Sequence, residues 1–308
     1  MHMKPILFLV IILFTYSLSA CGQKTTAEKL GYPKDTKLLI IHADDLGVSH
    51  SENMATIQSM EKGQTNSASI MVPTPWFSEI AAWSAAHPKA DFGLHLVLTS
   101  EWKYYKWRPL SDEVPGLANK EGFFYASVDS VYQHASLQEV EKELRKQIEK
   151  AKQFGVDFTH FDSHMGALFG REDYFKLLIK LGREYKVPIL RARTGPRSDE
   201  DLNSDANDKD VFLDAVFTAN PNDFKGGMEN FYTGVLKKLQ PGLNEIIMHV
   251  AYDNDEMQAV TIDHPDWGAA WRQADYNFFT SEKCRKTLKD LNIQLVTWRE
   301  LRDKIVRK

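Results

Sequence analysis

The feature that most restricts the fold of this chain is a series of short apolar runs, each about as long as one β-strand. Most of them are nearly continuous, whereas a strand with one face in water alternates apolar and polar residues. Continuous runs are typical of parallel strands that are buried on both faces. We therefore expect strands at residues 37–44, 67–73, 91–98, 158–162, 188–193, 245–251 and 293–298.

Amphipathic helical patterns separate these runs. The clearest covers residues 137–154, where apolar residues three or four positions apart form one stripe. Ser136 and Glu139 form a capping box at its start, and Gly155 stands where a helix would end. Further helices are expected at residues 173–186 and 281–291. The alternation predicts a single α/β domain, an irregular (β/α) barrel with about seven mostly parallel strands.

Two long stretches interrupt the alternation of strands and helices. Residues 99–136 are rich in aromatic side chains with proline and glycine between them, and residues 194–230 contain a long polar tract. Long segments without a regular pattern in an α/β domain commonly carry binding or catalytic residues. We expect both stretches to be excursions over the mouth of the barrel.

The first residues have the form of a targeting segment. Lys4 precedes an apolar run at 6–14, which is shorter than the roughly 17–25 residues that span a bilayer. The sequence LSAC at 18–21 resembles a bacterial lipoprotein box, which implies that Cys21 is lipidated; an ordinary signal peptide or an uncleaved anchor is the alternative. We expect a signal at 1–21, a polar tether at 22–36 and the domain at 37–308. The protein would be exported and held at the membrane by lipid alone, in the periplasm or at the outer membrane.

The composition excludes some classes of protein. The 308 residues are 43% hydrophobic, enough for one large domain, and a net charge of −4 gives no general attraction to nucleic acid. Only Cys21 and Cys284 are cysteines. If Cys21 carries lipid, Cys284 has no partner within the chain and is expected to be a buried thiol. The oligomeric state, including a homo-oligomer, stays open.

Ionisable residues occur at the ends of several predicted strands. Asp44 and Asp45 follow the first apolar run, His95 lies in the third, and His249 lies in the sixth. Because the carboxyl ends of parallel strands meet at the active-site mouth, these side chains are expected to lie close together. Adjacent carboxylates repel each other and need a cation, a shared proton or water.

The fourth run adds three ionisable residues at alternate positions, His160, Asp162 and His164. At strand spacing they face the same side, and such a cluster is costly to bury unless it is paired or binds a metal. Each residue alone also fits a structural role, as a solvated turn, a core histidine or a hydrogen-bonded pair. One carboxylate with two imidazoles can form a facial metal site, and the remaining Asp and His are then candidates for proton transfer.

In this combination the chain resembles the YdjC-like carbohydrate deacetylases, which include chitooligosaccharide deacetylases and are distantly related to the polysaccharide deacetylases. The resemblance covers roughly residues 37–303. Each motif is weak alone, but their order is specific. The motifs are the ADDLG segment at 43–47, Asn53, Gly63, SAS at 67–69, GLHL at 93–96, THFDSH at 159–164 and NEIIMH at 244–249.

The resemblance implies a role for each matching residue. Asp45, His95 and His164 match the ligands of one divalent metal ion, Asp44 matches the general base, and His249 matches the acid that protonates the leaving amine. Two imidazoles favour Zn²⁺, and the resemblance also admits Mg²⁺. Asp162, His160 and Arg191 are expected to be supporting or substrate-binding residues. We infer that Arg191 pairs with Asp44.

The resemblance implies a hydrolase that acts on an amide of an N-acetylated carbohydrate. The substrate surroundings depart from the family pattern, since Met165–Gly166–Ala167 follows His164 and Val250 follows His249. The aromatic residues at 102–107 suit sugar stacking, core packing or lid closure equally well.

Two other functions stay open. A glycoside hydrolase needs carboxylates roughly 5–9.5 Å apart across a sugar, which suits adjacent aspartates poorly. A non-catalytic carbohydrate-binding lipoprotein would lose some of these residues, yet every matching position is present.

Overall fold

The computed structural model describes residues 24–193 and 206–308. The predicted signal segment with Cys21 therefore lies outside the described residues, as does part of the second predicted excursion. Within the described ranges, no helix is long and apolar enough to cross a membrane.

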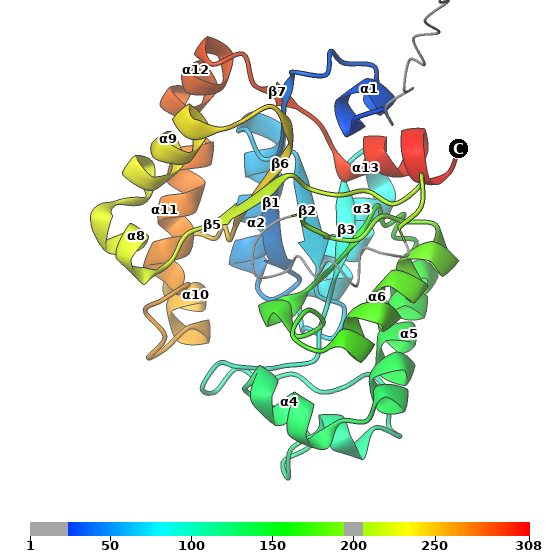
Figure 1. Ribbon diagram of the computed structural model, residues 1–308. Helices are drawn as coiled ribbons and strands as arrows, with labels where there is room; N and C mark the ends of the chain where they lie inside the picture. Colours follow the sequence, from blue (N-terminus) through cyan, green and yellow to red (C-terminus); the bar gives the residue numbers. More distant parts are fainter. Residues whose placement is uncertain (1–23, 194–205) are drawn as a thin grey trace, which may run out of the picture.

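Parallel strands form one sheet in the part of the chain that the structure describes, and Figure 1 shows it curling at the centre of the molecule. The order is β4-β3-β2-β1-β6-β5, and β7 pairs with the first residues of β1. This arrangement confirms the predicted α/β fold with a curled parallel sheet. The strands are β1 (Lys37–Leu46), β2 (Ser67–Ile70), β3 (Phe92–Leu96), β4 (Phe161–Ser163), β5 (Ala215–Thr218), β6 (Gly242–Met248) and β7 (Gln294–Leu295).

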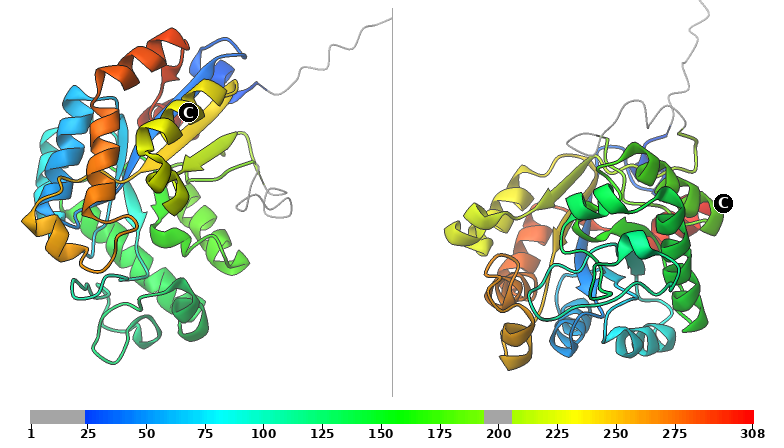
Figure 2. Two further views of the ribbon diagram at one scale, coloured as in Figure 1. Left: turned by 90° about the vertical axis from the view of Figure 1, so that its left-hand side faces the viewer. Right: turned by 90° about the horizontal axis from the view of Figure 1, so that it is seen from below.

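Helices surround the curled sheet, with α5 and α6 on one side and α9, α11 and α12 on the other (Figures 1 and 2). The short α1 lies beside the C-terminal segment. The helical elements are α1 (Thr26–Leu30), α2 (His50–Lys62), α3 (Phe77–Ala86), η1 (Pro115–Leu117), α4 (Val128–His134), α5 (Leu137–Gln153), η2 (His164–Gly166), α6 (Glu172–Tyr185), α8 (Pro221–Gly226), α9 (Met228–Lys238), α10 (Asp255–Val260), α11 (Ala269–Phe279), α12 (Glu282–Asp290), α13 (Trp298–Leu301) and η3 (Arg302–Val306).

The three predicted helices are present within one residue of their expected ends. Helix α5 begins with the expected capping box, in which Ser136 and Glu139 satisfy each other's main-chain N–H groups. Gly155 follows the helix with a φ of 79°, a left-handed conformation that costs glycine little. Cys284 is fully buried, as expected.

Two predictions about strands were wrong. Residues 188–193 form no regular strand and make only isolated bridges, Ile189 to Phe161 and Ala192 to Leu213. They still connect the β4 edge to the segment before β5, so the curled sheet is closed irregularly at this place. Strand β5 lies in the stretch expected to be an excursion; it is short and only half-buried, so it has no continuous apolar run.

The excursion at 99–136 lies beyond one end of the sheet, opposite α1 (Figure 1). Trp102 and Trp107 are buried in the core, and the Trp107 indole donates a hydrogen bond to the carbonyl of Thr99 (2.8 Å). Tyr104 is 71% exposed. Core packing therefore accounts for the two tryptophans, and Trp102 also lines the central pocket described below.

Gly93 in β3 is required by the histidine beside it. The His160 ring occupies the space that a Cβ at Gly93 would need, and it stacks on Trp298 at a centroid distance of 5.0 Å. We expect Gly93→Ala to lower the free energy of unfolding by about 1–3 kcal/mol, the usual cost of overpacking. Denaturant unfolding measures this, with Gly234→Ala as the control, because a Cβ there meets no atom within 4 Å. Equal effects at the two positions would contradict the packing argument.

Candidate functional site

A pocket of about 630 Å³ opens at the carboxyl ends of the strands, a volume within the usual range for ligand sites. Strands β1, β3 and β4 and the residue after β6 each contribute ionisable side chains to it. The sequence-predicted residues that line the pocket are Asp44, Asp45, His95, Asp162, His164 and His249. The structure thus brings these six together from four separate segments.

Both aspartates reach the pocket because the backbone of β1 is irregular at this point. The register with β2 shifts between Ala43 and Leu46, and Asp45 has a φ of 72°. A regular extended strand would direct Asp44 and Asp45 to opposite faces. Aspartate tolerates the left-handed conformation better than most residues, so a bulge with Asp at this position is physically reasonable.

Asp45, His95 and His164 converge on one point. The Oδ1 of Asp45 lies 3.3 Å from Nε2 of His95 and 3.1 Å from Nδ1 of His164. Ligand atoms at right angles around an ion, with bonds of about 2.0–2.1 Å, lie about 3 Å apart. The three side chains therefore have the chemistry and spacing of a facial site with two imidazoles and one carboxylate.

A carboxylate holds the far nitrogen of each of these histidines. His95 Nδ1 donates to Asp162 Oδ1 (2.7 Å), and His164 Nε2 donates to Glu101 Oε2 (2.9 Å). Metal-binding histidines nearly always donate their other N–H in this way, which fixes the tautomer and directs the free nitrogen to the ion. These contacts are a second observation, independent of the spacing, that fits a metal.

Two other groups of side chains in the described residues are close enough to hold a cation. One contains His42, His160 and Asp162, and the other contains Asp44, His95 and Asp162. His42 and His160 are fully buried and do not line the pocket, so a substrate cannot reach an ion there. In the second group His95 would use the nitrogen that already donates to Asp162. The group around Asp45 is the best candidate because all three of its members line the pocket and each of its histidines can use the nitrogen opposite the one that donates to Asp162 or Glu101.

Arg272 of α11 and Glu52 of α2 lie behind the predicted ligands. Arg272 Nη2 donates to Asp45 Oδ2 (2.8 Å), and Nη1 pairs with Glu52. Burial would raise the pKa of Asp45, but the charge of Arg272, together with the neighbouring histidines, holds that pKa well below its ordinary value. Asp45 is therefore ionised and ready to bind a cation.

The cation beside Asp44 is His42 rather than Arg191. His42 Nε2 lies 3.1 Å from Asp44 Oδ1 and from Asp162 Oδ2, and Ser69 also donates to Asp44. Burial would raise the pKa of Asp44, but the charge of His95 and the hydrogen bond from His42 lower it. Burial would lower the pKa of His42, but its bonds to the two aspartates raise it to about 10.

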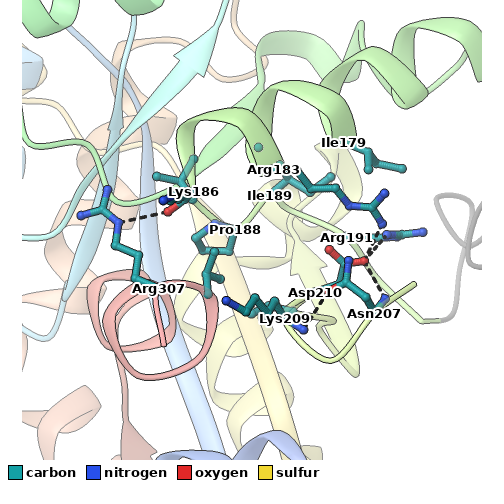
Figure 3. Close-up of a pocket in the computed structure, with 14 residues that line it drawn as sticks. Ile179, Arg183, Lys186, Pro188, Ile189, Arg191, Asn207, Lys209, Asp210 and Arg307 are labelled. Atoms are coloured by element: carbon teal, nitrogen blue, oxygen red, sulfur yellow. Dashed lines mark hydrogen bonds and ion pairs between the residues drawn. The ribbon is translucent and has the colours of Figure 1, made fainter. Parts of the chain in front are cut away.

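Arg191 lies in a different place from the one we inferred. It pairs with Asp210 at 3.7 Å and packs on the ring of Phe212, in a second pocket that also contains Arg183 (Figure 3). Among the described residues, no ion pair joins Arg191 to Asp44. The sequence places Arg191 near the end of an extended segment, but this position does not determine the direction of its side chain.

His249 lies beside the ligands but is held differently. Its Nε2 is 3.7 Å from Asp45 Oδ2, and its main-chain N–H donates to the buried Asp275 (3.1 Å). Burial lowers the pKa of His249 to about 4, so its imidazole is neutral near pH 7.

His160 and Asp162 occupy different layers of the site. Asp162 reaches the pocket and orients His95, whereas His160 lies beneath it with Nε2 3.7 Å from Asp162 Oδ2. Of the two roles considered for His160, substrate binding is excluded by its full burial and a supporting role is left.

Sequence reasoning gave no role to His42, Glu101, Arg272 or Glu52. His42 could have been found, because it stands two positions before Asp44 and therefore on the same face of β1. Arg272 is a charged residue on the face of α11 that also buries Trp271 and Asp275, an unusual position for an arginine. Nothing in the sequence pairs it with Asp45, 227 residues away.

The comparisons with known proteins agree with this arrangement. The family model described as YdjC-like protein matches residues 38–290. A carbohydrate deacetylase of Thermus thermophilus is 32% identical, over 87% of this chain and 94% of that protein. A carbohydrate deacetylase of Thermoanaerobacter pseudethanolicus is 27% identical, over 85% and 98%.

A solved structure shares the fold. It is a protein of Enterococcus faecalis V583 named as a candidate for cellobiose-phosphate cleavage, with a TM-score of 0.72 and 22% identity. It matches 86% of this chain and 99% of its own. Because the family model matches most of the chain and the Thermus protein is similar over 87% of it, this chain belongs to the YdjC-like family.

Proposed function

We propose that this protein is a metal-dependent hydrolase that removes acetyl groups from N-acetylated sugars or oligosaccharides. The observation that carries the proposal is the convergence of Asp45, His95 and His164 on one point of a pocket, with an ionised Asp44 beside them. The two relatives named carbohydrate deacetylase support the reaction and the class of substrate.

A divalent cation held by Asp45, His95 and His164 would polarise the acetyl carbonyl and make a water molecule more acidic. Zn²⁺ suits the two imidazoles and Mg²⁺ suits the carboxylate and water, so both belong to the proposal. Asp44 accepts the proton of the attacking water, because its lowered pKa keeps it ionised and its other contacts fix its direction. His42 and Ser69 are these contacts.

His249 delivers a proton to the nitrogen of the leaving amine when the C–N bond breaks. Its imidazole is neutral at rest, so it takes this proton from water in the pocket during the reaction, while Asp44 holds the proton of the attacking water and later returns it to solvent. Negative charge that develops on the acetyl oxygen raises the pKa of a neighbouring imidazole. His249 thus becomes an acid when the amine needs one, and it stays uncharged beside the cation before that.

Acetate release tests the proposal. Protein stripped of metal is assayed with N-acetylglucosamine and N,N′-diacetylchitobiose, before and after addition of Zn²⁺ or Mg²⁺. We expect acetate only after metal is restored, and no new reducing ends. New reducing ends would indicate a glycoside hydrolase, and sugar binding without acetate release would indicate a binding protein. His95→Ala and His164→Ala should lose metal and activity together, whereas the exposed His87→Ala should lose neither.

A further inference from the structure

A strained turn before α11 forms part of the pocket wall. Asp263 and Trp267 have φ angles of 60° and 56°, left-handed conformations that are costly for a bulky residue such as tryptophan. His264 and Trp267 both line the pocket and are partly exposed. Backbone strain of this kind persists only where neighbouring contacts hold it, so the contacts of the turn show what it positions.

Two hydrogen bonds hold the turn next to the predicted metal ligands. Arg272 Nε donates to the carbonyl of Trp267 (2.7 Å), and the same guanidinium donates to Asp45. Thr261 Oγ1 accepts from the N–H of Ala269 (3.2 Å). Gly268 is also needed, because a Cβ there would overlap the carbonyl of His264. The side chain of Arg272 thus contacts both Trp267 and the predicted ligand Asp45.

Stacking fixes the orientation of the Trp267 ring. It lies on Trp271 at a centroid distance of 4.9 Å and an angle of 27°, and Trp271 lies on Phe224 at 4.9 Å and 25°. Trp271 covers one face of the Trp267 ring, and Trp267 also lines the pocket and is partly exposed, so part of the ring is accessible to a ligand. An aromatic ring that is held on one side loses little conformational freedom when a ligand covers the other.

We propose that Trp267 is a stacking surface for a pyranose ring of the substrate. This inference rests on the proposed function. The apolar face of a pyranose, formed by its C–H groups, suits an indole ring. The pocket of about 630 Å³ is within the usual range of ligand sites, so a sugar ring fits beside this surface.

His264 supplies a polar contact beside this surface. Its Nδ1 donates to the carbonyl of Asp266 (2.6 Å), which leaves Nε2 for a contact with a sugar hydroxyl. A sugar is apolar on its faces and polar at its rim, so an aromatic ring beside a directed polar group suits it.

The test separates substrate binding from turnover in the metal-loaded protein. We expect Trp267→Ala to raise KM for N,N′-diacetylchitobiose about tenfold and to change kcat by less than about twofold. Trp267→Phe keeps an aromatic face and should restore most of the affinity. The main-chain carbonyl that binds Arg272 is present in every variant, so metal content should not change.

Trp76→Ala is the matched control, because Trp76 is 38% exposed and does not line the pocket. Disaccharide binding is also measured by calorimetry in the Asp44→Asn background, where turnover is slow. A loss of binding with Trp267→Ala, in a protein that releases no acetate, would uphold this inference and reject the proposed function. The inference is overturned if the disaccharide does not bind, or if Trp267→Ala acts like Trp76→Ala.

Discussion

Replacing Asp44 with asparagine should leave the metal bound and reduce turnover by about 100-fold or more, the usual scale for a lost general base. Asparagine keeps the shape of the side chain and can still accept hydrogen bonds from His42 and Ser69, but it cannot take a proton from water. Steady-state kinetics and elemental analysis of the same preparation measure the two effects separately.

Asp45→Asn is the matched comparison, since it makes the same chemical change one residue further along. We expect this variant to lose metal, because Asp45 Oδ1 lies within 3.3 Å of both histidine nitrogens. It also removes the carboxylate that pairs with the buried Arg272, so its unfolding must be measured as well. Full activity of Asp44→Asn, or metal loss as severe as in Asp45→Asn, would show that the two aspartates do not divide the work in this way.

The strands that carry the site could be predicted because burial on both faces leaves a strong pattern. Strands β1, β3 and β6 each contain a buried apolar run, and each run includes or is followed by an ionisable residue of the pocket. Strand β5 could not be found in this way, because it is an edge strand with half-buried side chains. Residues 188–193 have an apolar pattern but make only isolated bridges, which a pattern in the sequence does not reveal.

Some residues of the site could likewise be predicted from the sequence, and others could not. The sequence pointed to the side chains that face the pocket, because they stand at strand ends in a recognisable order. It did not reveal the residues behind them, such as Arg272 and Glu101, whose contacts depend on helices and loops distant in the chain. The bulge that directs Asp45 into the pocket was also missed, because it arises from the register between β1 and β2.

Metal binding should release two protons near pH 7. Burial would lower the pKa values of both histidines, but the charges of Asp44 and Asp162 raise that of His95 well above its ordinary value. The charges of Glu101 and Asp45 raise the pKa of His164 to about 9. Without metal both imidazoles are therefore protonated at pH 7, whereas a ligand imidazole must offer a lone pair.

The affinity for Zn²⁺ should therefore rise with pH by about 100-fold per unit between pH 6 and 8, one factor of ten for each proton, and the rise should become shallower above pH 9, where His164 is already neutral. Calorimetry in two buffers with different ionisation enthalpies counts the protons released. Glu101→Gln is the informative variant: it removes the charge that contributes most to the raised pKa of His164, so it should release fewer protons at pH 7. If the Zn²⁺ affinity of the wild-type protein did not change between pH 6 and 8, this prediction would be wrong. His95 and His164 would then be neutral before the metal binds.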